Sequence, residues 1–156
     1  MEMTTILHNE ITINAPIEKI WEALSNIENL DKFDPTVKKS TALTAKKNGI
    51  GAKRKVDMKD GKNWFEDRVI EFQPNQILTY QLINCSFPVT GLKHSYSFER
   101  IETCVKVKQI MQYRVKFGLF GKILDALMIR KQTEKGIKKF FEGLKSYAEG
   151  NSYSNK

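Results

Sequence analysis

Glu66, Asp67 and His94 are the side chains of this sequence whose types best suit acid–base chemistry. A carboxylate or an imidazole held beside a substrate can act as a general acid or base. Glu66 and Asp67 are adjacent in the chain, whereas His94 lies far from both, so spacing alone does not assemble a site. These three residues are the catalytic candidates, although a lone histidine more often serves as a structural hydrogen-bonding residue.

The histidines and cysteines of the chain follow no metal-binding pattern. His8 and His94 belong to no HExxH motif, and Cys85 and Cys104 form no CxxC pair. Zinc sites in sequences are recognised by such grouped ligands. The sequence therefore predicts no metal site, and nothing in it calls for a cofactor.

The length and composition of the chain fit one domain. Of its 156 residues, 40% are hydrophobic, which is enough to bury a core without disulfides or metals. We expect a single domain over residues 1–149 and a disordered polar tail over residues 150–156. No stretch of about 18 apolar residues could span a bilayer, and residues 1–9 lack the pattern of a signal peptide. We therefore expect a reduced, cytoplasmic setting.

The charge balance favours anionic partners. The chain has 26 Lys and Arg against 18 Asp and Glu, a formal charge of +8. Basic and aromatic residues do not interleave as they do on single-strand platforms, so no specific nucleic-acid partner is predicted. Most of the charges are expected on solvated faces, with transient contact with an anionic membrane as the alternative. We expect a monomer or a weak dimer.

The first part of the chain predicts one strand and two short helices. Alternation of apolar and polar residues places the strand at Leu7–Ile13. Asn14 is the expected cap of the first helix, because its side chain can accept from a free backbone N–H. The second helix is expected at about Ile27–Lys32, and it must stop before Pro35.

From residue 37 onward, turn residues recur at short intervals and separate six expected strands. The strands are Val37–Thr44, Ala52–Met58, Asn63–Phe72, Ile77–Asn84, Leu92–Arg100 and Thr103–Val115. Asp60 and Gly61 predict a two-residue hairpin turn. Because the connections are short and contain no helix, we expect an antiparallel meander.

Apolar residues then recur at helical spacing from about Phe117 to Tyr147 without a proline. A helix of this length would span about 45 Å, which is longer than a small domain needs for packing alone. We expect this helix to lie across the curved sheet and to close a cavity against it. The predicted class is α+β, with about seven strands wrapped around the long C-terminal helix.

Several segments of the chain resemble one family in order. They are Asn14–Trp21 with Leu24, Ser25, Leu30, Phe33, Pro35 and Val37, then Gly49–Arg54, Glu66–Val69 and Gly143–Tyr147. These segments resemble the START-like superfamily, which includes Bet v 1 proteins and polyketide cyclase/dehydrase and lipid-transport type domains. The resemblance covers about residues 5–149. One departure is Phe33 and Asp34, where the family often has Trp before the proline.

This resemblance implies a helix-grip fold with a hydrophobic cavity between the sheet and the long helix. Family members use such a cavity to bind or transport lipids, steroids and polyketides, and some use it for catalysis. The expected partner is therefore a small apolar ligand. The family implies no single activity, so function must be argued from the site.

Strand parity selects the residues that should face this cavity. In the last strand, Gln109, Met111 and Tyr113 share a face with valines and should point inward. Gln109 and Tyr113 would then be polar groups in an apolar wall. They either hydrogen-bond to neighbouring strands or buried water, or they orient a ligand. Tyr96 shares a strand face with His94 and is also a candidate ligand-binding residue.

The same parity turns Arg54 and Val56 towards the interior. A buried guanidinium needs a partner, which Glu66 or Asp67 on the next strand could supply. The alternative is that Arg54 meets a carboxylate or phosphate of a ligand, for which its shape is suited.

On the long helix, Ile123 and Leu127 are expected at the cavity, and Arg130 interrupts the apolar stripe. Arg130 is expected to be interior, where it would either pair with Glu134 or stand at the cavity mouth. The apolar start of this helix could form core, a gate, or a face for a membrane or a second subunit.

The prediction from the sequence is binding or transport of a lipid-, polyketide- or steroid-like ligand. The alternative is a cyclase/dehydrase-type enzyme that uses the same cavity. A third hypothesis is an interaction protein that docks through its basic surface and its apolar helix start.

Overall fold

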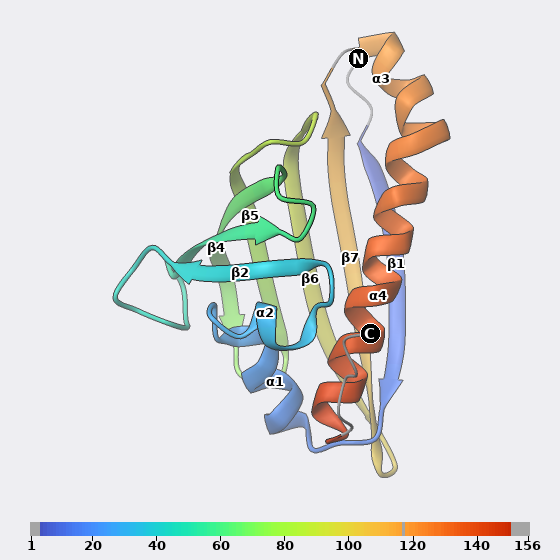
Figure 1. Cartoon of the computed structure of the whole chain (residues 1–156). Coiled ribbons are helices and arrows are strands. Elements are labelled where there is room, and N and C mark those ends of the chain that lie inside the picture. Colours follow the sequence, from blue (N-terminus) through green and yellow to red (C-terminus); the bar gives the residue numbers. More distant parts are fainter. Residues whose placement is uncertain (1–3, 117, 151–156) are drawn as a thin grey trace.

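The computed structural model describes residues 4–116 and 118–150, and for residues 121, 122, 124 and 125 it describes the backbone alone. All seven strands form one antiparallel sheet in the order β1-β7-β6-β5-β4-β3-β2. The strands are β1 (Thr5–Ile13), β2 (Val37–Ala42), β3 (Lys53–Met58), β4 (Trp64–Gln73), β5 (Ile77–Cys85), β6 (Val89–Ile101) and β7 (Cys104–Val115). The strands β1 and β2 are the two edge strands of the sheet. Two short helices, α1 (Ile17–Ser25) and α2 (Leu30–Phe33), connect them (Figure 1). The predicted meander is confirmed, because every consecutive pair from β2 to β7 is antiparallel.

The chain after β7 forms one long helical segment, as predicted, but not one regular helix. It consists of α3 (Gly118–Leu124), a π-helical turn η1 (Asp125–Ile129) and α4 (Arg130–Ala148). The predicted starting residue, Phe117, lies outside the described residues. In Figure 1, α4 lies across one face of the sheet and α3 extends to the end of the molecule where β7 ends. The predicted helix-grip arrangement is thus confirmed.

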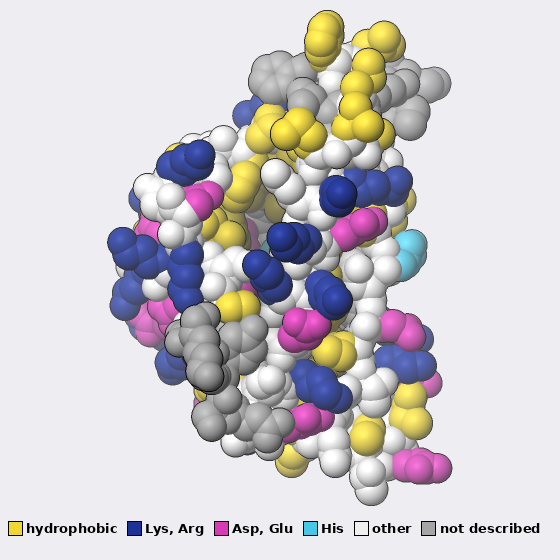
Figure 2. Space-filling model, turned by 45° about the vertical axis from the view of Figure 1, so that its right-hand side comes forward, with side chains coloured by type: hydrophobic (Ala, Val, Ile, Leu, Met, Phe, Trp, Pro, Cys, Tyr) yellow, Lys and Arg dark blue, Asp and Glu magenta, His cyan; other side chains and the backbone are white. Residues whose placement is uncertain are grey.

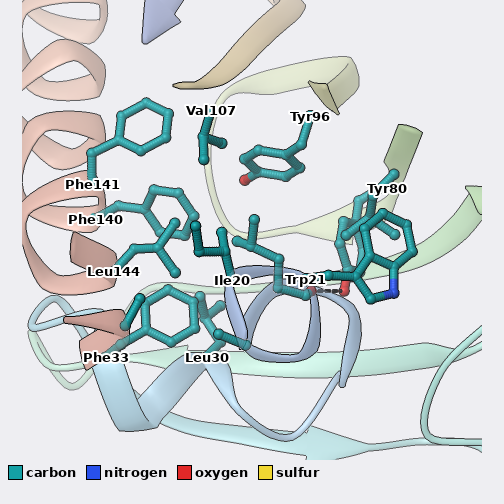
Figure 3. Close-up of a cluster of buried hydrophobic side chains, with 14 of the residues drawn as sticks. Ile20, Trp21, Leu30, Phe33, Tyr80, Tyr96, Val107, Phe140, Phe141 and Leu144 are labelled. Atoms are coloured by element: carbon teal, nitrogen blue, oxygen red, sulfur yellow. Dashed lines mark hydrogen bonds between the residues drawn. The ribbon is translucent and has the colours of Figure 1, made fainter. Parts of the chain in front are cut away.

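The apolar side of α4 makes the core with α1, α2 and the sheet. Phe140 packs against Phe33 with ring centroids 5.5 Å apart and against Tyr96 at 5.9 Å. Trp21 of α1 meets Phe72 and Phe98 edge to face. Figure 3 shows part of this core, with Phe140 and Leu144 of α4 turned towards the residues of α1 and α2.

Two local predictions were wrong. Pro16, not Asn14, is the N-cap of α1, and the Asn14 backbone N–H instead donates to the Glu149 Oε1 atom at 2.8 Å. The β3–β4 connection runs from residue 59 to residue 63, longer than the predicted two-residue turn. The Asp60 carboxylate holds this loop by accepting from the backbone N–H groups of Lys62 and Asn63. An Asp side chain that caps its own loop removes the need for a tight turn.

None of the helices in the described ranges combines the length and the apolar composition that a bilayer span requires.

Candidate functional site

A cavity of about 330 Å³ lies between α4 and the sheet. A volume of this size is within the range of small-molecule sites in proteins. Its walls come from α2, the α2–β2 connection, strands β3, β4, β6 and β7, the β5–β6 connection, the end of η1 and the first half of α4. The lining residues are Leu30, Asp34, Thr36, Arg54, Met58, Phe65, Phe87, Pro88, Val89, Leu92, His94, Tyr96, Gln109, Met111, Tyr113, Ile129, Gln132, Thr133, Gly136, Ile137 and Phe140. Most of this surface is apolar, so the few polar groups determine how a guest molecule could be oriented.

Five of the predicted ligand-binding residues lie on this cavity wall: Arg54, Tyr96, Gln109, Met111 and Tyr113. Strand parity placed them there correctly, because inward positions alternate along β3, β6 and β7. Val56 is also inward and fully buried, but it packs in the core below the cavity wall instead of lining it.

Three predicted positions on the helix were wrong. The side chains of Ile123 and Leu127 are 55% and 69% exposed and do not line the cavity. Arg130 is exposed, not interior, and among the described residues it forms no ion pair with Glu134. The described side chains from Leu119 to Met128 are all exposed, because α3 and η1 lie at the end of the molecule, beyond the core that α4 covers.

Arg54 and Asp67 form a buried ion pair on neighbouring strands. The Arg54 Nε atom donates to Asp67 Oδ1 at 2.8 Å, and Nη2 donates to Oδ2 at 3.1 Å. The two residues are direct cross-strand partners, which is why the fork of the guanidinium meets the carboxylate squarely. Of the two carboxylates predicted as partners, Asp67 is the one found.

The two charges of this pair hold each other in the ionised state. Burial alone would raise the pKa of Asp67, but the Arg54 charge and the hydrogen bonds from His94 and Arg54 bring it below its ordinary value. Burial acts to lower the pKa of Arg54, and the Asp67 carboxylate outweighs it, so the pKa of Arg54 is raised. A carboxylate held in this way is a poor proton acceptor.

A chain of hydrogen bonds extends from this pair along the sheet. His94 Nε2 lies 3.4 Å from Asp67 Oδ2, and His94 Nδ1 lies 3.0 Å from the Tyr96 hydroxyl. Gln109 Nε2 donates to the same hydroxyl at 3.1 Å, and Asn9 Nδ2 donates to Gln109 Oε1 at 3.3 Å. These hydrogen bonds therefore connect polar side chains of β1, β7, β6, β4 and β3 in one network, of which Arg54, His94, Tyr96 and Gln109 line the cavity.

Tyr80 packs against two residues of this network, His94 and Arg54. Its ring stacks on His94 at 5.3 Å, and the Arg54 guanidinium lies 4.1 Å from the ring centroid. Its hydroxyl donates to the Leu24 carbonyl oxygen at 2.7 Å. Burial raises the pKa of Tyr80 to about 12, so the hydroxyl keeps its proton and its donor role.

Asp34 is a cavity residue that the sequence reasoning missed. Its Oδ1 atom accepts from the backbone N–H and the hydroxyl of Thr36, which closes an Asx turn around Pro35. Burial raises the pKa of Asp34 above its ordinary value, although Thr36 and Arg54 act against this. The Asp-Pro-Thr sequence predicts the turn, but it gives no sign that the turn borders a cavity.

The three catalytic candidates occupy different places. His94 lines the cavity, whereas Asp67 lies behind Arg54 and Glu66 is on the opposite face of β4 from Asp67. Among the described residues, no group of three His, Cys, Asp or Glu side chains could hold a metal ion.

Several solved structures share this fold. The protein XoxI from Bacillus cereus is 16% identical with a TM-score of 0.73, over 92% of this chain and 95% of that chain. A point mutant of norcoclaurine synthase from Thalictrum flavum, solved with a transition-state analogue, is 17% identical with a TM-score of 0.73, over 95% and 96%. Ara h 8.0201 is 15% identical with a TM-score of 0.75, over 96% and 100%. At these identities the likeness establishes the fold alone.

The sequence itself gives the family. No curated protein sequence matches the chain. A family model described as polyketide cyclase/dehydrase and lipid transport matches residues 4–149, and the chain therefore belongs to this family.

Proposed function

We propose that the protein binds a small hydrophobic or amphipathic ligand in the cavity between the sheet and α4. The observation that carries the proposal is the cavity of about 330 Å³, whose mostly apolar walls include a network of hydrogen-bonded polar side chains. Transfer of an apolar ligand from water into such a site is favourable, and a few fixed polar groups orient the ligand. The family, described as including lipid transport, supports this function.

Gly136 offers a direct test of the proposal. It lines the cavity in the middle of α4, and a Cβ atom placed there would meet no atom within 4 Å. Gly136→Leu therefore adds side-chain volume at the cavity wall while replacing a poor helix former with a good one.

The binding of N-phenyl-1-naphthylamine, an uncharged probe that fluoresces in apolar sites, measures the effect. We expect saturable binding to the wild type and at least about tenfold weaker binding to Gly136→Leu, with an unchanged or higher Tm. Gly136→Ala is the matched control and should bind the probe as the wild type does. The absence of saturable binding to the wild type, or full binding to Gly136→Leu, would contradict the proposal.

We also propose transient contact with an anionic membrane. The supporting observation is the helix-start patch, which is the exposed apolar set Leu119, Phe120, Ile123, Leu127 and Met128 on α3 and η1. Figure 2 shows hydrophobic side chains gathered at that end of the molecule, with Lys and Arg side chains on the surface below it. Apolar residues bordered by cations suit the interface of an acidic bilayer.

Catalysis in the same cavity is the second candidate function, and one observation favours it. His94 lines the cavity, and Asp67 and Tyr96 fix its two ring nitrogens. Because both ring nitrogens are engaged, His94 would exchange a proton with a bound substrate through the Tyr96 hydroxyl, which also lines the cavity. Turnover of a polyketide or hydroxy-acyl substrate that is lost in His94→Gln would support this role, and turnover unaffected by that change would contradict it.

A further inference from the structure

The cavity wall presents charge at few positions. Arg54 is the only Lys or Arg among the described residues that line it, and Asp34 is the only carboxylate among them. The chain as a whole carries a formal charge of +8, so a cavity open to anionic ligands could easily have included more cations. The charge state of Arg54 and its neighbours therefore decides which ligands the cavity accepts.

The charge of Arg54 is already neutralised. Asp67 holds two of its nitrogens at 2.8 and 3.1 Å, with both side chains at most 4% exposed. Asp34 contributes a second carboxylate to the same wall, close enough to act electrostatically on Arg54. The wall thus has no uncompensated positive charge with which to receive an anion.

The donor and the acceptor of each hydrogen bond in the network can be assigned. An ionised carboxylate only accepts hydrogen bonds, so His94 Nε2 carries the hydrogen that points to Asp67. Since the Tyr96 hydroxyl accepts from Gln109, its own hydrogen fits the lone pair of His94 Nδ1. The oxygen of Gln109 is likewise taken by Asn9. The acceptors of the network are therefore largely occupied by the network itself.

Within this network, the groups left for a ligand are donors. Arg54 lines the cavity, and its Nη1 atom has no hydrogen-bond acceptor among the described residues. Gln109 also lines the cavity, and its Nε2 atom has two hydrogens, of which one goes to Tyr96. These donors match a single oxygen acceptor, such as a carbonyl, ester or hydroxyl oxygen.

From this arrangement we infer that the cavity selects uncharged ligands with an oxygen acceptor at their polar end and rejects anionic amphiphiles such as fatty acids. A carboxylate buried here would lose its hydration and gain no free cation in return, and this loss exceeds what a hydrogen bond to the paired Arg54 restores. The inference rests on the proposed ligand-binding function and specifies its substrate class.

The test compares two probes that differ by one anionic group. N-phenyl-1-naphthylamine is uncharged, and 8-anilinonaphthalene-1-sulfonate has the same aromatic frame with a sulfonate. Titrations in about 1 M NaCl, where charges are screened beyond about 3 Å, suppress binding of the sulfonate to surface lysines. We expect the uncharged probe to bind the wild type at least about tenfold more tightly. Equal or tighter binding of the sulfonate, in competition with the uncharged probe, would overturn the inference.

Asp67→Asn tests the cause of the selection. This change frees the charge of Arg54, so the affinity for the sulfonate relative to the uncharged probe should rise at least about tenfold. Glu66→Gln is the matched control, because it removes a carboxylate from the neighbouring residue, whose side chain does not line the cavity. An unchanged preference in a folded Asp67→Asn protein would overturn the inference.

A third variant keeps the test valid if Asp67→Asn does not fold. Asp34→Asn removes the other carboxylate near Arg54 and retains an oxygen that can accept from Thr36. It should shift the preference towards the sulfonate in the same direction, and no shift would count against the inference. Failure of both probes to bind any of these proteins would instead contradict the proposed binding function.

Discussion

Gly143 of α4 lies directly against the backbone carbonyl of Phe33, at the end of α2. A Cβ atom built on Gly143 would stand 1.9 Å from the Phe33 carbonyl oxygen and 3.1 Å from the Pro35 ring. Real Cβ atoms do not come this close to a backbone oxygen, so only glycine fits while the two helices keep their places. This contact fixes how deeply the C-terminal half of α4 sits on the fold.

Gly143→Ala should therefore destabilise the protein by about 1–3 kcal/mol, because the added methyl group forces α4 and α2 apart. Chemical denaturation monitored by circular dichroism measures the change. Gly136→Ala is the control on the same helix, where the Cβ atom meets open space and the gain in helix propensity of about 1 kcal/mol is not opposed. Equal effects of the two substitutions would show that the close approach has no energetic consequence.

Tyr80→Phe should lower the stability by about 1–2 kcal/mol. The Tyr80 hydroxyl donates to the Leu24 carbonyl oxygen in the last turn of α1, where helix carbonyls lack partners within the helix. Removing the hydroxyl leaves this buried oxygen unpaired, while the ring still stacks on His94. Thermal unfolding measures the loss, and an unchanged Tm would mean that water replaces the hydroxyl.

Asp34 should make the stability depend on pH in a direction opposite to that of most carboxylates. Burial raises its pKa in the folded state, so the folded protein binds more protons than the unfolded chain between the two pKa values. Its contribution therefore favours folding at low pH and is lost as the pH rises through the folded pKa.

Asp34→Asn removes this effect while keeping the acceptor for Thr36. The variant should have a higher Tm than the wild type near neutral pH, and the difference should shrink below about pH 3, where the Asp34 side chain of the wild type is also uncharged. A difference in Tm that is independent of pH would contradict this account.

The fold was largely predictable because its signals are local. Turn residues set the limits of β3, β5 and β7 to within two residues, and alternation placed Gln109 and Tyr113 on the inner face. The same alternation predicted that Arg54 would be buried and would need a carboxylate partner from the next strand. Strand parity succeeds here because each strand has one face on the core.

The parts that could not be predicted depend on contacts between distant segments. Leu127 is exposed because α3 and η1 lie at the end of the molecule, where every described side chain from Leu119 to Met128 is exposed, and helical periodicity does not show where a helix leaves the core. Asp34 reaches the cavity only because α2 is held under α4, as its packing of Phe33 on Phe140 shows. Sequence periodicity shows which side of a helix or strand is apolar. It does not show how two such elements pack against each other.

The helix-start patch predicts a second measurable behaviour, binding to acidic vesicles. Phe120 and Leu127 are 76% and 69% exposed, and together with Leu119, Ile123 and Met128 they form a contiguous apolar patch of the kind that marks a site of interaction. Residues 116–139 contain seven Lys or Arg and two Asp or Glu, so this stretch of chain is attracted to anionic lipid.

We expect the protein to float with vesicles containing phosphatidylserine and to remain unbound with vesicles of phosphatidylcholine alone. Because exposed charges are screened by salt, binding should weaken as NaCl is raised from about 0.1 M to about 1 M. Phe120→Ser with Leu127→Ser should reduce flotation at least about tenfold, since the insertion of apolar side chains is lost. Lys38→Ser with Lys39→Ser, on β2 away from the patch, is the control for charge alone. Full flotation of the Phe120 and Leu127 variant would show that the patch does not contact the membrane. If the wild type forms dimers that this variant abolishes, the partner of the patch is a second copy of the chain.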